Sequence, residues 1–157
     1  MQQLTKTGKD ILNAVNYTTE TPEAYETMCE ITMAYAEQNG LMYRETNNNI
    51  SKGSEVELAD VLLKYKKSAI VISSALHGCI IGVAMGIKVI AVSGDWKIDA
   101  FMESVGLQDW VINYDETQKL PGLLNDIDNQ PDSTLHLSSI KLANEKVEKK
   151  IRQFVLG

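Results

Sequence analysis

The sequence predicts an α/β fold, a Rossmann-like three-layer sandwich with a mainly parallel sheet of about five strands. Two apolar runs rich in β-branched residues, at 69–72 and 88–92, are separated by a segment of helical periodicity at 76–86. The same alternation of short apolar runs and helix-periodic segments extends from residue 10 to residue 112. Strands separated by helices at this interval indicate right-handed βαβ units and a parallel sheet covered by helices.

The elements follow one another in a regular order. A first strand is predicted at 10–17, although its apolar residues also suit a short helix. Thr21 and Pro22 then mark a helix start, and Gly40 supplies the left-handed stop of that helix. The pattern next predicts a strand at 41–46, a polar loop at 47–53, a helix opened by the capping box Ser54 to Glu57, strands at 69–72 and 88–92, helices at 76–86 and 97–105, and a short apolar run at 110–112.

The first two predicted helices carry apolar stripes that we expect to face the sheet. These stripes are Met28, Ile31, Ala34 and Tyr35 in the first helix, and Val56, Ala59, Leu62 or Leu63, and Lys66 in the second.

The C-terminal part of the chain is predicted to be a turn-rich connector at 125–133 followed by a charged helix at 138–155. This helix has a stripe that we interpret as packing across the domain, with partner binding as the alternative: Ile140, Ala143, Val147, Ile151 and Val155. The length of 157 residues predicts one domain over 1–157, with a core of sheet and helices over about 10–125 and a C-terminal helix over 134–157.

Composition narrows the class of protein. A hydrophobic content of 44% is ordinary for a globular domain, and the N-terminus lacks the apolar segment of a signal peptide. We therefore expect a cytoplasmic protein without a transmembrane segment. A net charge of −6 opposes binding to nucleic acid. Cys29 and Cys79 lie in apolar helical patterns, where a thiol acts as a small buried hydrophobe.

Polar residues follow two neighbouring predicted strands at the point where each ends. Ser73 and Ser74 close the strand at 69–72, and His77 and Gly78 open the next helix. Ser93, Gly94 and Lys97 follow the strand at 88–92 in the same way. Open parallel sheets bind ligands at this edge, because helix N-termini there offer unpaired N–H groups and a favourable dipole. These seven residues are therefore the candidate site for a phosphate or carboxylate.

Each of these residues also has a structural interpretation. His77 is a candidate acid or base near neutral pH, but a lone histidine in a first helical turn commonly donates to a backbone carbonyl. Ser73 and Ser74 are equally good helix caps, and Lys97 could be merely solvated. Trp96 is either a stacking platform for a sugar or base, or a packing residue beside the core.

Several kinds of site have no support in the sequence. It contains no G-x-G-x-x-G, no G-x-x-x-x-G-K-[ST], no Cys-x-x-Cys and no G-x-S-x-G. His77 and His136 are the two histidines, and the acidic residues lack metal-ligand spacing. We therefore expect no metal and no bound cofactor.

The segment 69–106 resembles the C-terminal half of the polysaccharide pyruvyltransferase family. The residues that carry the resemblance are Ser74-Ala75-Leu76-His77-Gly78, Gly86, the strand from Val89 to Val92, Lys97, Phe101 and Ser104-Val105-Gly106. The resemblance implies one half of a B-type glycosyltransferase fold and transfer of pyruvate from phosphoenolpyruvate to a sugar hydroxyl of a cell-surface polysaccharide or its precursor. It further implies that Ser74, His77 and Lys97 bind the anionic donor, that His77 is an acid catalyst, and that the acceptor site lies on a partner domain.

Two features favour other interpretations. Many family members have Arg at the position of Ala75, and the chain has about the length of one of the two domains of such an enzyme. A stand-alone domain that binds a small phosphorylated or carboxylate ligand without chemistry, and an assembly module without a ligand, are the alternatives. In each case we expect the chain to work as a homo-oligomer or with a partner N-terminal domain.

Overall fold

The structure is a computed structural model that describes residues 8–16, 20–46 and 55–134, together with C-terminal positions 136–138, 141–142, 145–146, 149–150 and 153. Five parallel strands form one sheet with the order β2-β1-β3-β4-β5. The strands are β1 (Asp10–Ala14), β2 (Met42–Glu45), β3 (Ser68–Ser73), β4 (Lys88–Ser93) and β5 (Val111–Asn113). The two strands predicted to be adjacent and central, β3 and β4, pair in parallel, as expected.

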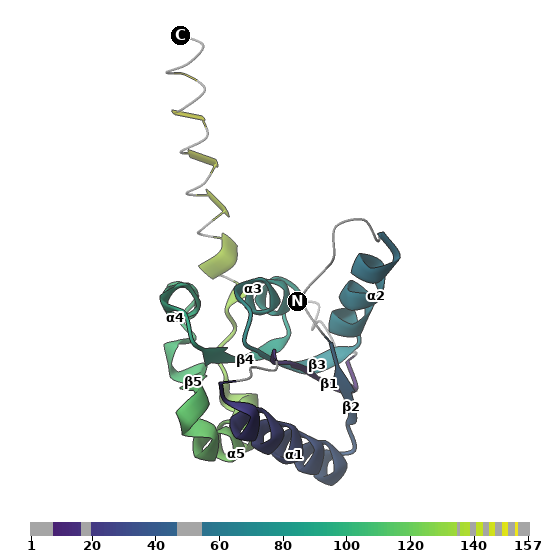
Figure 1. Ribbon diagram of the computed structural model, residues 1–157. Coiled ribbons are helices and arrows are strands. Elements are labelled where there is room, and N and C mark those ends of the chain that lie inside the picture. Colours follow the sequence, from purple (N-terminus) through teal and green to yellow (C-terminus); the bar gives the residue numbers. More distant parts are fainter. Residues whose placement is uncertain are drawn as a thin grey trace.

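Helices cover both faces of this sheet, as Figure 1 shows. On one face lie α1 (Pro22–Asn39) and α5 (Leu120–Asn125), and on the other lie α2 (Glu55–Lys66), α3 (Leu76–Ala84) and α4 (Trp96–Ser104). Short 3-10 helices, η1 (Gln108–Trp110), η2 (Tyr114–Lys119) and η3 (Ile127–Asn129), complete the C-terminal part. The predicted Rossmann-like three-layer α/β fold is confirmed.

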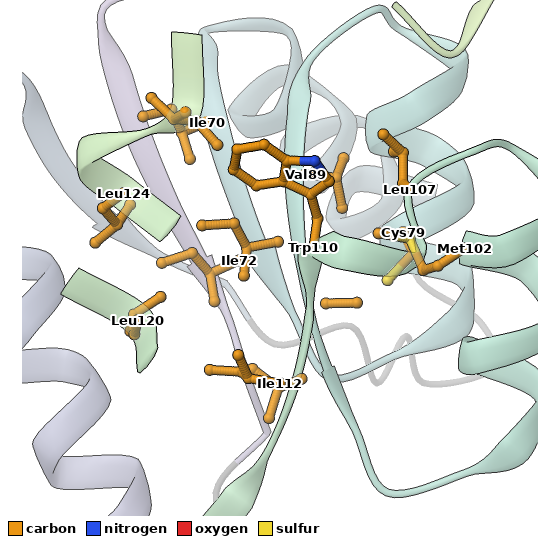
Figure 2. Close-up of a cluster of buried hydrophobic side chains, with 14 of the residues drawn as sticks. Ile70, Ile72, Cys79, Val89, Met102, Leu107, Trp110, Ile112, Leu120 and Leu124 are labelled. Atoms are coloured by element: carbon orange, nitrogen blue, oxygen red, sulfur yellow. The ribbon is translucent and has the colours of Figure 1, made fainter. Parts of the chain in front are cut away.

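The core forms where the apolar strands meet these helices. Figure 2 shows Leu120 and Leu124 on one side of Ile72, and Cys79 and Met102 on the other side of the cluster. A second cluster lies on the α2 side of the sheet, where Tyr65 is fully buried with Leu12, Ala14 and Val71. Strands buried on both faces explain why the sequence shows continuous apolar runs instead of alternation.

Helix α1 faces the core with most of the predicted stripe, since Met28 is buried and Ile31 and Tyr35 pack against the core while partly exposed. Its buried residues are Met28, Cys29, Thr32 and Ala36, whereas Ala34 is exposed. Apolar periodicity does not predict burial of Thr32, because threonine is polar. Its hydroxyl can be buried because it donates to Met28 O at 2.7 Å, within the same helix. The predicted stop at Gly40 is confirmed, since its φ is 64° and its N–H bonds back to the last turn.

Helix α2 also differs from its prediction. Ala59 and Lys66 are exposed, and Tyr65 takes the fully buried position that the stripe assigned to its neighbour. An aromatic residue with a large apolar surface gains more from burial than lysine, so the helix is rotated accordingly. The polar loop at 47–53, the capping box from Ser54 to Glu57 and the side chain of Val56 lie outside the described residues.

Gly82 sets the distance between α3 and the sheet. A Cβ placed on Gly82 would lie 2.6 Å from Val89 Cγ2 and 3.8 Å from Val71 Cβ. Both valines belong to the central strands beneath the helix. Gly82 therefore has a packing role, because the absence of a side chain lets α3 lie close to the central strands.

Gln130 extends the hydrogen bonding of the sheet beyond its short edge strand. β5 pairs with β4 at Ala91, Val92 and Ser93, which leaves Val89 without a strand partner on that side. The Gln130 side chain replaces the missing strand: Val89 N donates to its Oε1 at 3.0 Å, and its Nε2 donates to Val89 O at 2.7 Å. Gln130 is 4% exposed, so these bonds form in a nearly dry environment.

All the described C-terminal positions from 136 to 153 are helical. Figure 1 shows these positions leading away from the sheet. The predicted apolar stripe from Ile140 to Val155 lies outside the described residues. Within the part of the chain that the structure describes, no helix is long and apolar enough to cross a membrane.

Candidate functional site

The candidate site lies along the carboxyl edge of the sheet. The strand order places β1 beside β3, and the helices that follow these two strands, α1 and α3, lie on opposite faces. Such a reversal opens a crevice between the two connections, where open α/β sheets characteristically bind their ligands. The polar residues predicted for the site follow β3 and β4 on this edge.

Ser73 and Ser74 have different environments. Ser73 is fully buried, and its hydroxyl is engaged with the backbone of Ala75, accepting from Ala75 N at 3.2 Å. Ser74 is half-buried, and its Oγ accepts a hydrogen bond from Asn16 N at 2.7 Å. Ser73 therefore shapes the turn after β3, whereas Ser74 joins that turn to the segment that follows β1.

The N-terminus of α3 is not capped by a side chain. The predicted capping by Ser73 or Ser74 is wrong, because the N-cap residue is Ala75, which has no polar side chain. Among the described residues, the backbone N–H groups of Leu76, His77 and Gly78 have no hydrogen-bond partner. Three unpaired N–H groups at the positive end of a helix dipole form a favourable place for an anion.

His77 lies in this open first turn, and its side chain is exposed. Within the described ranges its imidazole has no hydrogen-bond or ion-pair partner, so the backbone-bonded structural role considered above is not observed there. Gly78, next to it, is buried against the fold. The imidazole and the open N–H groups belong to the same helical turn.

The end of β4 is arranged differently. Ser93 is 4% exposed, and its hydroxyl donates to Asp95 O at 3.3 Å. Asp95 is the N-cap of α4, and its Oδ1 accepts from Lys97 N at 3.0 Å. A carboxylate therefore already occupies the position that an anion would take at α4. Gly94 and the side chain of Lys97 are exposed beside it.

The structure thus brings the seven predicted residues to one edge, where some are buried and others are accessible to solvent. Gly78, Ser73 and Ser93 are buried, and the hydroxyls of the two serines bond to the backbone of the turns that follow them. Ser74, His77, Gly94 and Lys97 are accessible to solvent to some degree. Of the two helix N-termini at this edge, α3 is open to an anion and α4 is closed by its own carboxylate.

A comparison with protein families shows the family of the chain. The family model for polysaccharide pyruvyl transferase matches residues 10–95, more than half of the chain. The chain belongs to the polysaccharide pyruvyl transferase family. Comparisons with curated proteins and with solved structures give no significant match.

The polysaccharide pyruvyl transferase match extends from β1 through α3 to the cap of α4, so it includes the carboxyl ends of β1, β3 and β4. The family predicted from the Ser74-Ala75-Leu76-His77-Gly78 motif is confirmed. Lys97 lies two residues beyond the matched segment, so its role depends on position alone.

Two asparagines at the end of β1 were missed by the sequence analysis. Asn13 is 2% exposed; its Oδ1 accepts from Val15 N at 3.1 Å, and its Nδ2 donates to Tyr43 OH at 3.0 Å. This fixes the path of the chain toward Asn16, which reaches Ser74. A polar residue within the apolar run 11–15 was a usable signal for Asn13, whereas the partner of Asn16 lies 58 residues away.

The cysteine next to the candidate site is not a reactive thiol, and the described residues do not indicate a metal site. Cys79, in the first turn of α3, is fully buried, and burial raises the pKa of its thiol to about 12. The thiol therefore stays protonated and unreactive at neutral pH. Among the residues that the structure describes, no group of three or more His, Cys, Asp or Glu side chains could hold a metal ion.

Two hollows lie at the opposite edge of the sheet. One, of about 350 Å³, is lined by residues that include Gly8, Lys66 and Ser68, and the other, of about 240 Å³, lies next to Gln130. Ser68 is already satisfied, since its hydroxyl donates to Lys64 O at 2.7 Å. Because parallel sheets bind ligands at their carboxyl ends, these hollows are weaker candidates than the edge that carries His77.

Proposed function

We propose that this domain transfers pyruvate from phosphoenolpyruvate to sugar hydroxyls of a cell-surface polysaccharide or its precursor. Membership of the polysaccharide pyruvyl transferase family supports this reaction class. The observation that carries the proposal is the uncapped first turn of α3, where three N–H groups without a partner among the described residues lie next to the exposed imidazole of His77. Phosphoenolpyruvate has the two anionic groups that such a turn and a nearby lysine can hold.

In this proposal the α3 N–H groups, Ser74 and Lys97 bind the carboxylate and phosphate of the donor, and His77 contacts the donor as the acid. Ser73 and Ser93 hold the two turns, the buried Gly78 packs the first turn of α3 against the fold, and the exposed Gly94 allows close approach to the backbone. Fixed N–H dipoles and an ammonium group stabilise the charge that develops on the departing phosphate. Histidine is the side chain that most often acts as a general acid or base, so the imidazole of His77 can deliver a proton to the donor.

The reaction balances as follows. The methylene carbon of phosphoenolpyruvate gains a proton and becomes a methyl group, which makes the adjacent carbon electrophilic. Two sugar hydroxyl oxygens form bonds to that carbon, and its bond to the phosphate oxygen breaks. The two hydroxyl protons balance the one taken up by the methyl group and the one that leaves with phosphate. The products are a pyruvate ketal and inorganic phosphate.

Calorimetric titration with phosphoenolpyruvate, and with phosphate as a minimal anion, tests the donor site. His77→Ala and Lys97→Ala should each weaken binding of phosphoenolpyruvate by about 1.5–3 kcal/mol, the range for hydrogen bonds to charged groups. His136→Ala, at an exposed histidine beyond the sheet, should leave the affinity unchanged. Unaltered affinity in both site variants, or no binding by the wild type at low salt, would refute the assignment.

The alternative function is a non-catalytic domain that binds the same kind of anion. Ala75 favours it, because the N-cap of α3 carries no guanidinium to assist the departure of phosphate. Phosphate release from phosphoenolpyruvate in the presence of sugar acceptors distinguishes the two. Binding without release, in the oligomer or in the complex with an N-terminal domain, would select the binding module.

A further inference from the structure

Trp96 is the feature of the candidate edge that the donor site does not use. It is the first residue of α4, and 72% of its surface is exposed. The other tryptophan, Trp110, is 7% exposed and packs in the core. The packing role considered for Trp96 from the sequence is therefore wrong. Exposing a large aromatic ring to water is unfavourable, so a ligand that covers it gains free energy.

The surroundings of Trp96 offer further groups for a ring-shaped polar ligand. A Cβ on Gly94 would lie 3.6 Å from Tyr114 Cε2, so a second aromatic ring flanks the turn that leads to Trp96. Ser93 pairs with Asn113 across β4 and β5, which places the η2 residues that follow Asn113, Tyr114 and the exposed Asp115, at the same end of the sheet. The Asn113 amide itself is engaged in the capping box of η2 with Glu116.

The charge of this region argues against a second anion. Asp95, Asp99 and Asp115 are exposed here, against the single exposed ammonium of Lys97 on the same turn and helix. Asp95 also closes the N-terminus of α4 to anions. A neutral ligand is therefore favoured over a nucleotide or a sugar phosphate at this end.

We propose that Trp96, which directly follows the turn that Tyr114 lies against, binds a sugar ring of the pyruvate acceptor. The C–H face of a pyranose is apolar and covers an aromatic ring, while its hydroxyls can donate to the exposed carboxylates of Asp95 and Asp99, which precede and follow Trp96 in the chain. This inference rests on the proposed transfer reaction for the identity of the sugar as acceptor. It divides the carboxyl edge between an anionic donor next to α3 and a neutral acceptor next to α4, so this chain supplies one wall of the acceptor site.

The test uses the full chain and a panel of methyl glucoside, methyl galactoside and methyl mannoside. At least one pyranoside should cause a saturable change in tryptophan emission and protect Trp96 from acrylamide, since Trp110 is already buried. By ligand-observed NMR or calorimetry, Trp96→Ala should weaken that binding about tenfold, and Trp96→Phe should retain most of it. Leu63→Ala, which removes another exposed apolar side chain, on α2, should have no effect.

The outcomes separate this inference from the donor site. Trp96→Ala should keep the wild-type affinity for phosphoenolpyruvate. His77→Ala should bind phosphoenolpyruvate more weakly and keep the wild-type affinity for the sugar. Sugar binding without phosphoenolpyruvate binding would refute the transfer reaction and leave a carbohydrate site at Trp96. If no pyranoside causes a saturable change, the sugar site is overturned. It is also overturned if the emission of Trp96 shifts with protein concentration alone, because that result would identify a contact between copies of the chain.

Discussion

Removing the Gln130 side chain should destabilise the domain strongly although it lies far from the candidate site. Gln130→Ala leaves both the N–H and the C=O of Val89 without partners, and Val89 is fully buried. Each buried polar group left unsatisfied costs about 1–3 kcal/mol, so the free energy of unfolding should fall by about 2–6 kcal/mol for the two groups. Gln130→Glu should be no better, because a carboxylate cannot donate to Val89 O.

Urea unfolding followed by circular dichroism measures this change, with Gln108→Ala, at an exposed glutamine, as the matched control. We expect a lower transition midpoint at an unchanged slope for both Gln130 variants, and no shift for the control. A loss below about 0.5 kcal/mol in Gln130→Ala would refute the view that this side chain substitutes for a strand.

Three further predictions concern α3, α4 and η2. Gly82→Ala should cost about 1–3 kcal/mol in urea unfolding, because the new methyl group overlaps a strand side chain, whereas Gly122→Ala, where a Cβ meets nothing within 4 Å, should be neutral or slightly stabilising. Asp95→Ala should cost about 1 kcal/mol through loss of the α4 cap, and equal destabilisation by Asp99→Ala, an acid of the same turn, would contradict the capping role. The pKa of Glu116 is lowered by hydrogen bonds from a lysine and an asparagine, so its stabilisation is present above the ordinary pKa of 4.5 and is lost as pH falls through the lowered value. The stability difference between wild type and Glu116→Gln should therefore vanish in acid, and a difference that persists at pH 2 would contradict this origin.

Local patterns predicted the sheet and the edge that carries the site. The runs at 69–72 and 88–92 became β3 and β4, because strands buried on both faces must be apolar throughout. The position of His77 and Lys97 followed from the rule that residues after parallel strands share one edge. These inferences need only the order of residues along the chain.

What the sequence could not reveal depends on contacts between distant segments. The bond from Asn16 to Ser74 and the clamp of Gln130 on Val89 join residues that are 58 and 41 positions apart. Helix rotation was also wrong for α2, since apolar spacing over 12 residues did not distinguish Tyr65 from Lys66 as the inward position. The open N-terminus of α3 could have been predicted, because Ala75 immediately before Leu76 has no capping group.

The buried thiol beneath the candidate site makes the motion of α3 measurable. Cys79 Sγ lies 3.9 Å from Ser73 O, between the first turn of α3 and the end of β3. A thiol that is fully buried and protonated reacts with a labelling reagent only after the helix has separated from the sheet. The rate of modification at Cys79 therefore reports how often this edge opens, and an anion bound to the turn of His77 would slow it.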